Sequence, residues 1–132
     1  MTQKLDFILL IDDDEATGFL HRIMAEESGI TDRIVLADSA EKGIEALRSL
    51  TSEFPTAHGI IFLDINMPVM DGWMFLDELR AEKNLNLKDI HIYMVSASDF
   101  PRDLERIQSE PLVNGYVPKP LTAEKIRDYA MN

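Results

Sequence analysis

The sequence has 132 residues with 13 basic and 24 acidic side chains, which gives a formal net charge of -11 at pH 7. This length is typical of one domain, and we expect residues 1–132 to form a single domain. The negative charge and the lack of a basic stripe argue against direct binding to nucleic acid, and the absence of cysteine excludes disulfides and thiolate metal sites. No apolar run in the sequence is long enough to span a membrane, so we expect a cytoplasmic protein without a membrane partner.

Short apolar runs recur along the chain and are separated by helical patterns. These runs are continuous, not alternating, and most of them are rich in branched residues: Phe7–Ile11, Ile34–Leu36, Ile60–Leu63, Ile92–Val95 and the weaker Tyr116–Val117. Continuous runs of this kind are typical of parallel strands that are covered on both faces.

A helical pattern follows each of these runs. The residues that indicate the helices are Leu20, Ile23 and Met24 in the first, Ile44, Leu47 and Leu50 behind the N-cap Ser39 in the second, Phe75, Leu76 and Leu79 behind Asp71 in the third, Pro101 at the start of the fourth, and Thr122 as the N-cap of the fifth. Strand and helix thus alternate five times, which predicts an α/β fold with a doubly wound, five-stranded parallel sheet. Pro118 indicates that the last strand lies at a sheet edge, where the strand order 2-1-3-4-5 would place it.

Polar residues stand where the predicted strands end. They are Asp12, Asp13 and Asp14 after the first strand, Asp64 after the third, Ser96 after the fourth and Lys119 after the fifth. Each has an ordinary structural explanation on its own, as a helix start, a turn residue, a cap or a solvated lysine. Because the carboxyl ends of parallel strands meet at one edge of a sheet, their joint placement favours a functional site there.

The types of side chain at this edge indicate metal-assisted phosphoryl chemistry. Crowded carboxylates repel one another unless a cation lies between them. Oxygen donors without nearby Cys or His favour magnesium, manganese or calcium over zinc. A carboxylate can accept a phosphoryl group, whose oxygens a metal ion, an ammonium and a hydroxyl can hold.

Four separated segments resemble the response-regulator receiver family of two-component signalling. Asp64–Gly72 resembles its phosphoacceptor segment, and Ile8–Asp13 resembles its first strand with the acidic pair. Met94–Ala97 resembles the strand that ends in the switch hydroxyl, and Gly115–Pro120 resembles the segment with the switch aromatic and the lysine. The resemblance implies one CheY-like receiver domain over residues 1–132, which accepts a phosphoryl group from a histidine kinase or a histidine phosphotransfer protein and passes a conformational change to a downstream protein.

The resemblance also implies roles for the acidic residues. Asp64 would accept the phosphoryl group. Asp13, Asp64 and the main-chain carbonyl of Asn66 would bind Mg²⁺ or Mn²⁺, while Asp12 would act largely through water. The domain would catalyse only its own phosphorylation and dephosphorylation, and would not be an enzyme acting on an outside substrate.

By the same resemblance, Lys119 and Ser96 would assist the phosphoryl chemistry, and Ser96 and Tyr116 would form the switch. Lys119 would contact the phosphoryl oxygens, Ser96 would move to hydrogen-bond them, and Tyr116 would turn inward in response. The Lys119–Pro120 bond is expected to be cis. Serine at position 96 keeps the hydroxyl of the commoner threonine, and Pro118 replaces the usual apolar residue.

Other functions fit the sequence less well. A flavodoxin-like cofactor binder needs a Ser/Thr/Gly-rich loop after the first strand, where this chain has three aspartates. A P-loop enzyme needs a G-x-x-x-x-G-K-[ST] motif, which is missing. A phosphohydrolase with an aspartate nucleophile needs Asp-x-Asp-x-Thr, which is not matched. A receiver fold used only for docking would not need the intact Asp13, Asp64, Ser96 and Lys119.

Several single residues receive structural interpretations. His21 is expected to be a solvated helix residue. Phe19 on the same helix is expected to pack in the core or, if exposed, to be an apolar anchor for a partner kinase that docks beside this helix. Trp73 is interpreted as a packed aromatic side chain in the third helix. His58 and His91 lie near the starts of strands and are expected to be structural.

Overall fold

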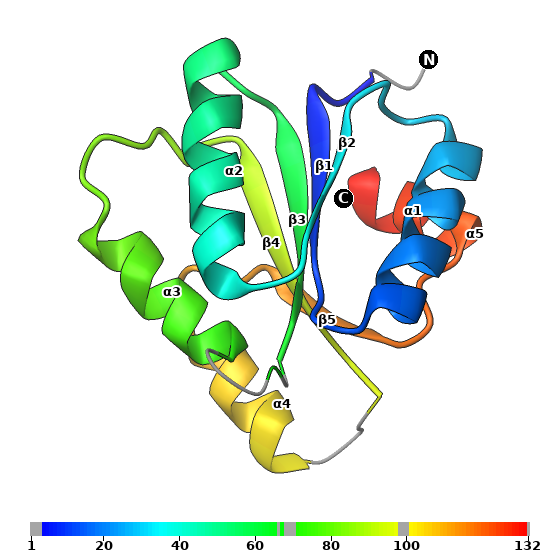
Figure 1. Ribbon diagram of the computed structural model, residues 1–132. Helices are drawn as coiled ribbons and strands as arrows, with labels where there is room; N and C mark the ends of the chain where they lie inside the picture. The colour runs from blue at the N-terminus through cyan, green and yellow to red at the C-terminus, as the bar shows by residue number, and fades with distance from the viewer. Residues whose placement is uncertain (1–3, 66, 68–70, 98–100, 132) are drawn as a thin grey trace.

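The computed structural model describes residues 4–65, 67, 71–97 and 101–131. Within these residues, parallel strands form one sheet in the order β2-β1-β3-β4-β5, as predicted (Figure 1). The strands are β1 (Phe7–Ile11), β2 (Ile34–Ala37), β3 (Gly59–Asp64), β4 (Ile90–Ser96) and β5 (Gly115–Pro118). Pro118 ends the edge strand β5, so the missing N–H group costs no ladder bond with a further strand.

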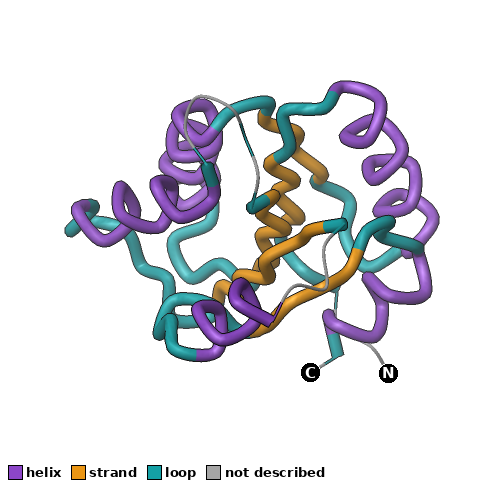
Figure 2. Tube along the Cα trace, turned by 90° about the horizontal axis from the view of Figure 1, so that it is seen from below, coloured by secondary structure: helices purple, strands orange, loops and turns teal. Residues whose placement is uncertain are grey.

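Helices cover both faces of this sheet. They are α1 (Glu15–Ser28), α2 (Ala40–Glu53), α3 (Gly72–Ala81), α4 (Pro101–Gln108) and α5 (Ala123–Ala130). In Figure 1, α1 and α5 lie on one side of the sheet, while α2, α3 and α4 lie on the other. Figure 2 looks at the end of the molecule where the strands finish, and shows the sheet between the two helical layers. In the described part of the chain, no helix combines the length and apolar character needed to cross a bilayer.

The helix starts follow the residues that the sequence indicated. The side chains of Ser39, Asp71 and Thr122 accept main-chain hydrogen bonds as N-caps of α2, α3 and α5. Such caps satisfy N–H groups that have no partner within the helix. The cap positions fix where each helix leaves the sheet, and therefore where the loops at the strand ends run.

The continuous apolar strands are explained by two separate cores. Phe7, Leu9 and Ile11 of β1 belong to a cluster shared with α2, α3 and α4. Ile8 and Leu10, which point to the opposite face, belong to a second cluster with α1 and α5. Because successive side chains of a strand alternate between the faces, a strand covered on both sides is apolar at every position.

The expected orientation of α1 is wrong. Phe19 is 63% exposed and Leu20 is 45% exposed, whereas His21 is only 3% exposed. The buried residues of α1 are Gly18, His21, Ala25 and Ser28. These mostly small residues let the helix lie close to its neighbours: a Cβ atom at Gly18 would lie 3.2 Å from Leu36 Cδ1 of β2. Close approach of the helix therefore favours this orientation, in which Phe19 and Leu20 are exposed while Ile23 and Met24 are half-buried.

The expectations for Trp73 and for the Lys119–Pro120 bond are confirmed, and the two other histidines lie near the starts of strands as the sequence placed them. Trp73 is buried at the start of α3, with the Arg106 guanidinium of α4 above its ring at 3.9 Å from the centroid. His58 precedes β3 and His91 lies at the start of β4, at the opposite end of the sheet from the strand carboxyl ends. The Lys119–Pro120 peptide bond is cis.

Candidate functional site at the strand carboxyl ends

Three carboxylates converge where β1 and β3 end. These strands are paired in parallel, with Ile11 opposite Leu63, so Asp12 and Asp64 leave the sheet side by side. One oxygen from each of Asp12, Asp13 and Asp64 lies within 4.8 Å of the other two. Asp12 and Asp64 are 5% and 4% exposed, whereas Asp13 is exposed.

This donor set is suited to a hard divalent cation. The described acidic cluster offers only carboxylate oxygens, which Mg²⁺ and Mn²⁺ accept and which Zn²⁺ favours less. Two buried carboxylates so close together also need a compensating positive charge. The residues therefore fit a bound divalent ion. Asn66, whose main-chain carbonyl was expected as a further ligand, lies outside the described residues.

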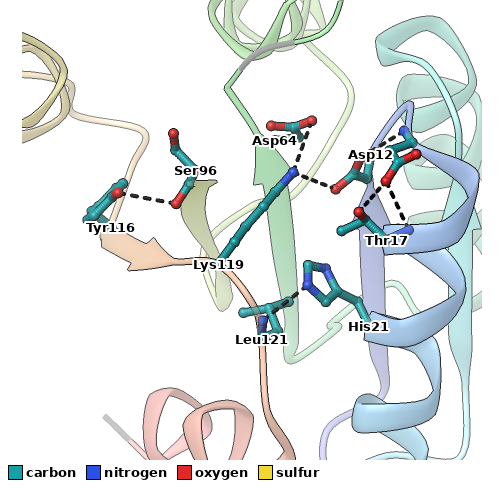
Figure 3. Close-up of polar contacts among 9 residues, drawn as sticks. Asp12, Thr17, His21, Asp64, Ser96, Tyr116, Lys119 and Leu121 are labelled. Carbon is teal, nitrogen blue, oxygen red and sulfur yellow. Dashed lines mark hydrogen bonds and ion pairs between the residues drawn. The ribbon is translucent and has the colours of Figure 1, made fainter. Parts of the chain in front are cut away.

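Lys119 supplies a positive charge to the same cluster. Its Nζ atom lies 3.0 Å from Asp12 Oδ2 and 3.5 Å from Asp64 Oδ2 (Figure 3). Burial acts to lower the pKa of Lys119, but the hydrogen bond and charge of Asp12, with those of Asp64, outweigh it and raise the pKa. The ammonium is therefore held in its charged form directly beside both buried carboxylates.

Asp14 has a different role from its two neighbours. Its carboxylate caps α1 by accepting hydrogen bonds from the Thr17 main-chain N–H, at 3.1 Å, and from the Thr17 hydroxyl. The hydrogen bond from the Thr17 side chain is the main reason that the pKa of Asp14 is lowered. The Asp14 N–H in turn donates to Asp12 Oδ1 at 2.9 Å. Asp14 is thus a helix cap, and it orients the carboxylate of Asp12.

Ser96 and Tyr116 lie beside the carboxylate cluster. Ser96 ends β4 and is 1% exposed. The Tyr116 hydroxyl of β5 donates to the Ser96 main-chain oxygen at 3.2 Å (Figure 3), and the Tyr129 hydroxyl of α5 donates to the Tyr116 main-chain oxygen at 3.2 Å. The predicted switch aromatic is therefore bonded to the residue that carries the predicted switch hydroxyl.

Gly72 allows α3 to start directly against the end of β3. A Cβ atom at this position would lie 2.7 Å from the Asp64 main-chain oxygen, so any side chain would force the helix away. The Gly72 N–H donates to the Ile65 main-chain oxygen at 3.0 Å. The first turn of α3, which contains Trp73, is thus fixed to the end of β3 from which Asp64 projects.

His21 lies near this site and is buried, although the sequence led us to expect a solvated residue. Its Nε2 atom accepts a hydrogen bond of 3.1 Å from the Leu121 main-chain N–H, in the loop that follows Lys119 (Figure 3). Burial is the main cause of its lowered pKa. Its spacing from Gly18 and Ala25 puts the three residues on one helix face. The small residues on that face are the sequence signal that could have indicated the buried side.

The chain is similar in sequence and fold to known signalling proteins. Residues 8–131 match the response regulator receiver domain family. A two-component response regulator from Cytophaga hutchinsonii has 29% identity and a TM-score of 0.85, with 98% of this chain and 99% of that chain covered. A Methanothrix harundinacea protein named "Probable methanogenesis regulatory protein FilR2" is 29% identical over 129 residues, covering 92% of this chain and 81% of the relative. Hybrid signal transduction histidine kinase E of Dictyostelium discoideum is 38% identical over 90 residues, covering 67% of this chain but only 5% of the kinase.

The fold and the acidic site together define a signalling domain of two-component systems. The chain belongs to the response regulator receiver domain family.

Proposed function

We propose that this receiver domain accepts a phosphoryl group on Asp64 from a histidine kinase or a histidine phosphotransfer protein. The observation that carries the proposal is the convergence of Asp12, Asp13 and Asp64, with the Lys119 ammonium beside the two buried carboxylates. A partner of this class is supported by the relative named hybrid signal transduction histidine kinase E, in which a segment similar to this chain is part of a histidine kinase.

Asp12, Asp13 and Asp64 would hold the divalent ion, Mg²⁺ or Mn²⁺. A bound ion would supply positive charge to offset the charge of the phosphoryl oxygens. The main-chain carbonyl of Asn66 is proposed as a further ligand on the family resemblance alone. The acidic cluster would repel an incoming phosphoryl group without a cation, so transfer should require the metal.

In the transfer step, an Asp64 carboxylate oxygen attacks the phosphorus of a phosphohistidine. A P–O bond forms, the P–N bond breaks, and the released imidazole takes up a proton. In the dephosphorylation step, water attacks the acyl phosphate, which releases inorganic phosphate and restores the Asp64 carboxylate. The Lys119 ammonium, 3.5 Å from Asp64 Oδ2, is placed to hold a phosphoryl oxygen through both steps.

Ser96 and Tyr116 would convert this event into a change of shape. The Ser96 hydroxyl would hydrogen-bond a phosphoryl oxygen, and the Tyr116 hydroxyl, already bonded to the Ser96 main chain, would follow. A ligand shifts a conformational balance only through contacts that differ between the states, and these new bonds are such contacts. The altered surface around β5 would then be read by a downstream protein.

Phosphorylation by a small donor tests the assignment of Asp64. Acetyl phosphate with Mg²⁺ should add one phosphoryl mass to the wild-type chain and none to Asp64→Asn, and excess chelator should abolish the addition. The control is Asp14→Asn, which alters the same edge of the sheet but keeps a good N-cap. Trp73, next to Gly72, should report the reaction by a change in emission on adding Mg²⁺, and again on adding beryllofluoride. Equal phosphorylation of Asp64→Asn at another residue would show that the assignment is wrong.

A further inference from the structure

The loop that carries Lys119 is fixed by contacts from three directions. We call residues Lys119–Leu121 the lysine loop. The Lys119 N–H donates to the Ser96 main-chain oxygen at 2.9 Å. The Lys125 ammonium of α5 donates to the main-chain oxygens on either side of Lys119, both at 3.0 Å. The third contact comes from α1, where His21 Nε2 accepts the Leu121 N–H at 3.1 Å.

The contact from α1 joins segments that are 100 positions apart in the sequence. Both partners are buried, since His21 is 3% exposed and Leu121 is 1% exposed. A buried N–H group that loses its partner costs free energy, so the loop would have to shift or open to water if the acceptor were removed. Because Nε2 accepts, the ring is neutral and carries its proton on Nδ1.

We propose that His21 is a positioning residue, which holds the lysine loop so that the Lys119 ammonium lies between Asp12 and Asp64. The proposal rests on the proposed function, because the ammonium can hold a phosphoryl oxygen only if Asp64 accepts a phosphoryl group. Leu121 lies two residues after Lys119, so a shift of its main chain moves the start of the lysine side chain. Hydrogen bonds lose strength steeply with distance, so a displacement of about 1 Å removes the lysine from contact.

The burial of His21 is not explained by packing alone. Its neighbours include Leu10, Phe62 and Leu121 of the apolar cluster on the α1 and α5 side of the sheet, where a leucine would fill the space without desolvating a polar ring. His21 also lines a cavity of about 10 Å³ together with Asp12 and Asp64, which places it directly beneath the acidic cluster. A polar side chain at this position therefore has a specific partner in the lysine loop and a specific place under the site.

Two substitutions separate positioning from packing. His21→Leu keeps the bulk but removes the acceptor, whereas His21→Gln keeps an acceptor oxygen on the same helix face. The first measurement is the affinity of each Mg²⁺-loaded protein for beryllofluoride, followed by Trp73 emission. The second is hydrogen exchange of the Leu121 amide in the free protein, which does not depend on phosphoryl chemistry. The control for lost stability is Leu50→Ala in α2, a buried residue of the other core cluster.

We expect His21→Leu to weaken beryllofluoride binding by about tenfold and to speed exchange at Leu121 by at least as much, as loss of one buried hydrogen bond implies. His21→Gln should restore both values to within about threefold, and Leu50→Ala should leave the beryllofluoride affinity unchanged despite its lower stability. Unchanged beryllofluoride affinity in folded His21→Leu would overturn the proposal, as would equal losses in His21→Leu and His21→Gln. A wild-type protein that binds no beryllofluoride would instead overturn the proposed function, and this proposal with it.

Discussion

Asp64→Asn is expected to stabilise the metal-free protein although it removes the proposed phosphoacceptor. The Asp64 oxygen lies within 4.8 Å of Asp12 and Asp13, so each repulsion amounts to about 3.5 kcal/mol at an effective dielectric constant of about 20. The attraction to Lys119 at 3.5 Å amounts to about 4.7 kcal/mol on the same scale. Because the exposed Asp13 is screened more strongly, we expect a net gain of about 1–2 kcal/mol in the free energy of unfolding.

Urea unfolding at pH 7 and low salt, with and without Mg²⁺, measures this gain. In chelator, Asp64→Asn should unfold at a higher urea concentration than the wild-type chain. Mg²⁺ at one hundred times its dissociation constant stabilises a protein by about 2.7 kcal/mol, and the variant should recover much less of this because it has lost a ligand. The order of stability should therefore reverse when Mg²⁺ is added.

The control is Glu45→Gln, which makes the same change in net charge on the exposed side of α2 and should shift stability by less than about 0.5 kcal/mol. If Asp64→Asn is less stable than the wild-type chain in chelator, repulsion among the three carboxylates does not dominate this site, and the metal is not needed to relieve it.

Four further substitutions have predictable outcomes. Burial lowers the pKa of His21 from its ordinary 6.5, so on acidification the unfolded chain takes up this proton at a higher pH than the folded chain. The free energy of unfolding should therefore fall as the pH drops below about 6.5. In thermal unfolding, His21→Gln should lose less stability than the wild-type chain between pH 7 and pH 5. Gly43→Ala should destabilise the protein by about 1–3 kcal/mol, because the new Cβ would lie 2.6 Å from Ile11 Cδ1. Gly18→Ala should stabilise it by up to about 1 kcal/mol, because its Cβ meets only the flexible end of Leu36 at 3.2 Å. Similar urea midpoints for the two variants would contradict this contrast. Phe19→Ala should leave the free energy of unfolding within about 0.5 kcal/mol of the wild-type value, because Phe19 is 63% exposed. It should slow phosphoryl transfer from the cognate kinase or phosphotransfer protein, and an unchanged rate would exclude Phe19 as a docking contact.

The strands and helix starts could be predicted because each depends on local signals. A fully covered strand must be apolar at every position, as in Phe7–Ile11, and a helix start needs an acceptor such as Ser39 or Thr122. The convergence of Asp12 and Asp64 followed from the parallel pairing of the strands that precede them. These features need no knowledge of side-chain packing.

The orientation of α1 could not be read from apolar content. Phe19 and Leu20 are larger and more apolar than His21, yet His21 is the buried one. Its burial depends on a hydrogen bond to a loop that lies 100 positions further along the chain. No local pattern contains that partner, although the small residues Gly18 and Ala25 lie on the same buried face of the helix.

The hydrogen bond between α1 and the lysine loop also has a consequence for biosynthesis. During synthesis the Asp12 and Asp64 segments leave the ribosome before the segment after β5. That later segment contains Lys119, which compensates the two carboxylates, and the Leu121 N–H, which donates to His21. The pairing of β1 with β3 can form before that, whereas the acidic pocket stays uncompensated until the edge strand joins the sheet. We therefore expect nascent chains that stop before Lys119 to be unable to compete with finished molecules for phosphoryl groups. The ability to accept a phosphoryl group would then appear only when β5 and the lysine loop join the sheet, and incomplete chains would lack it.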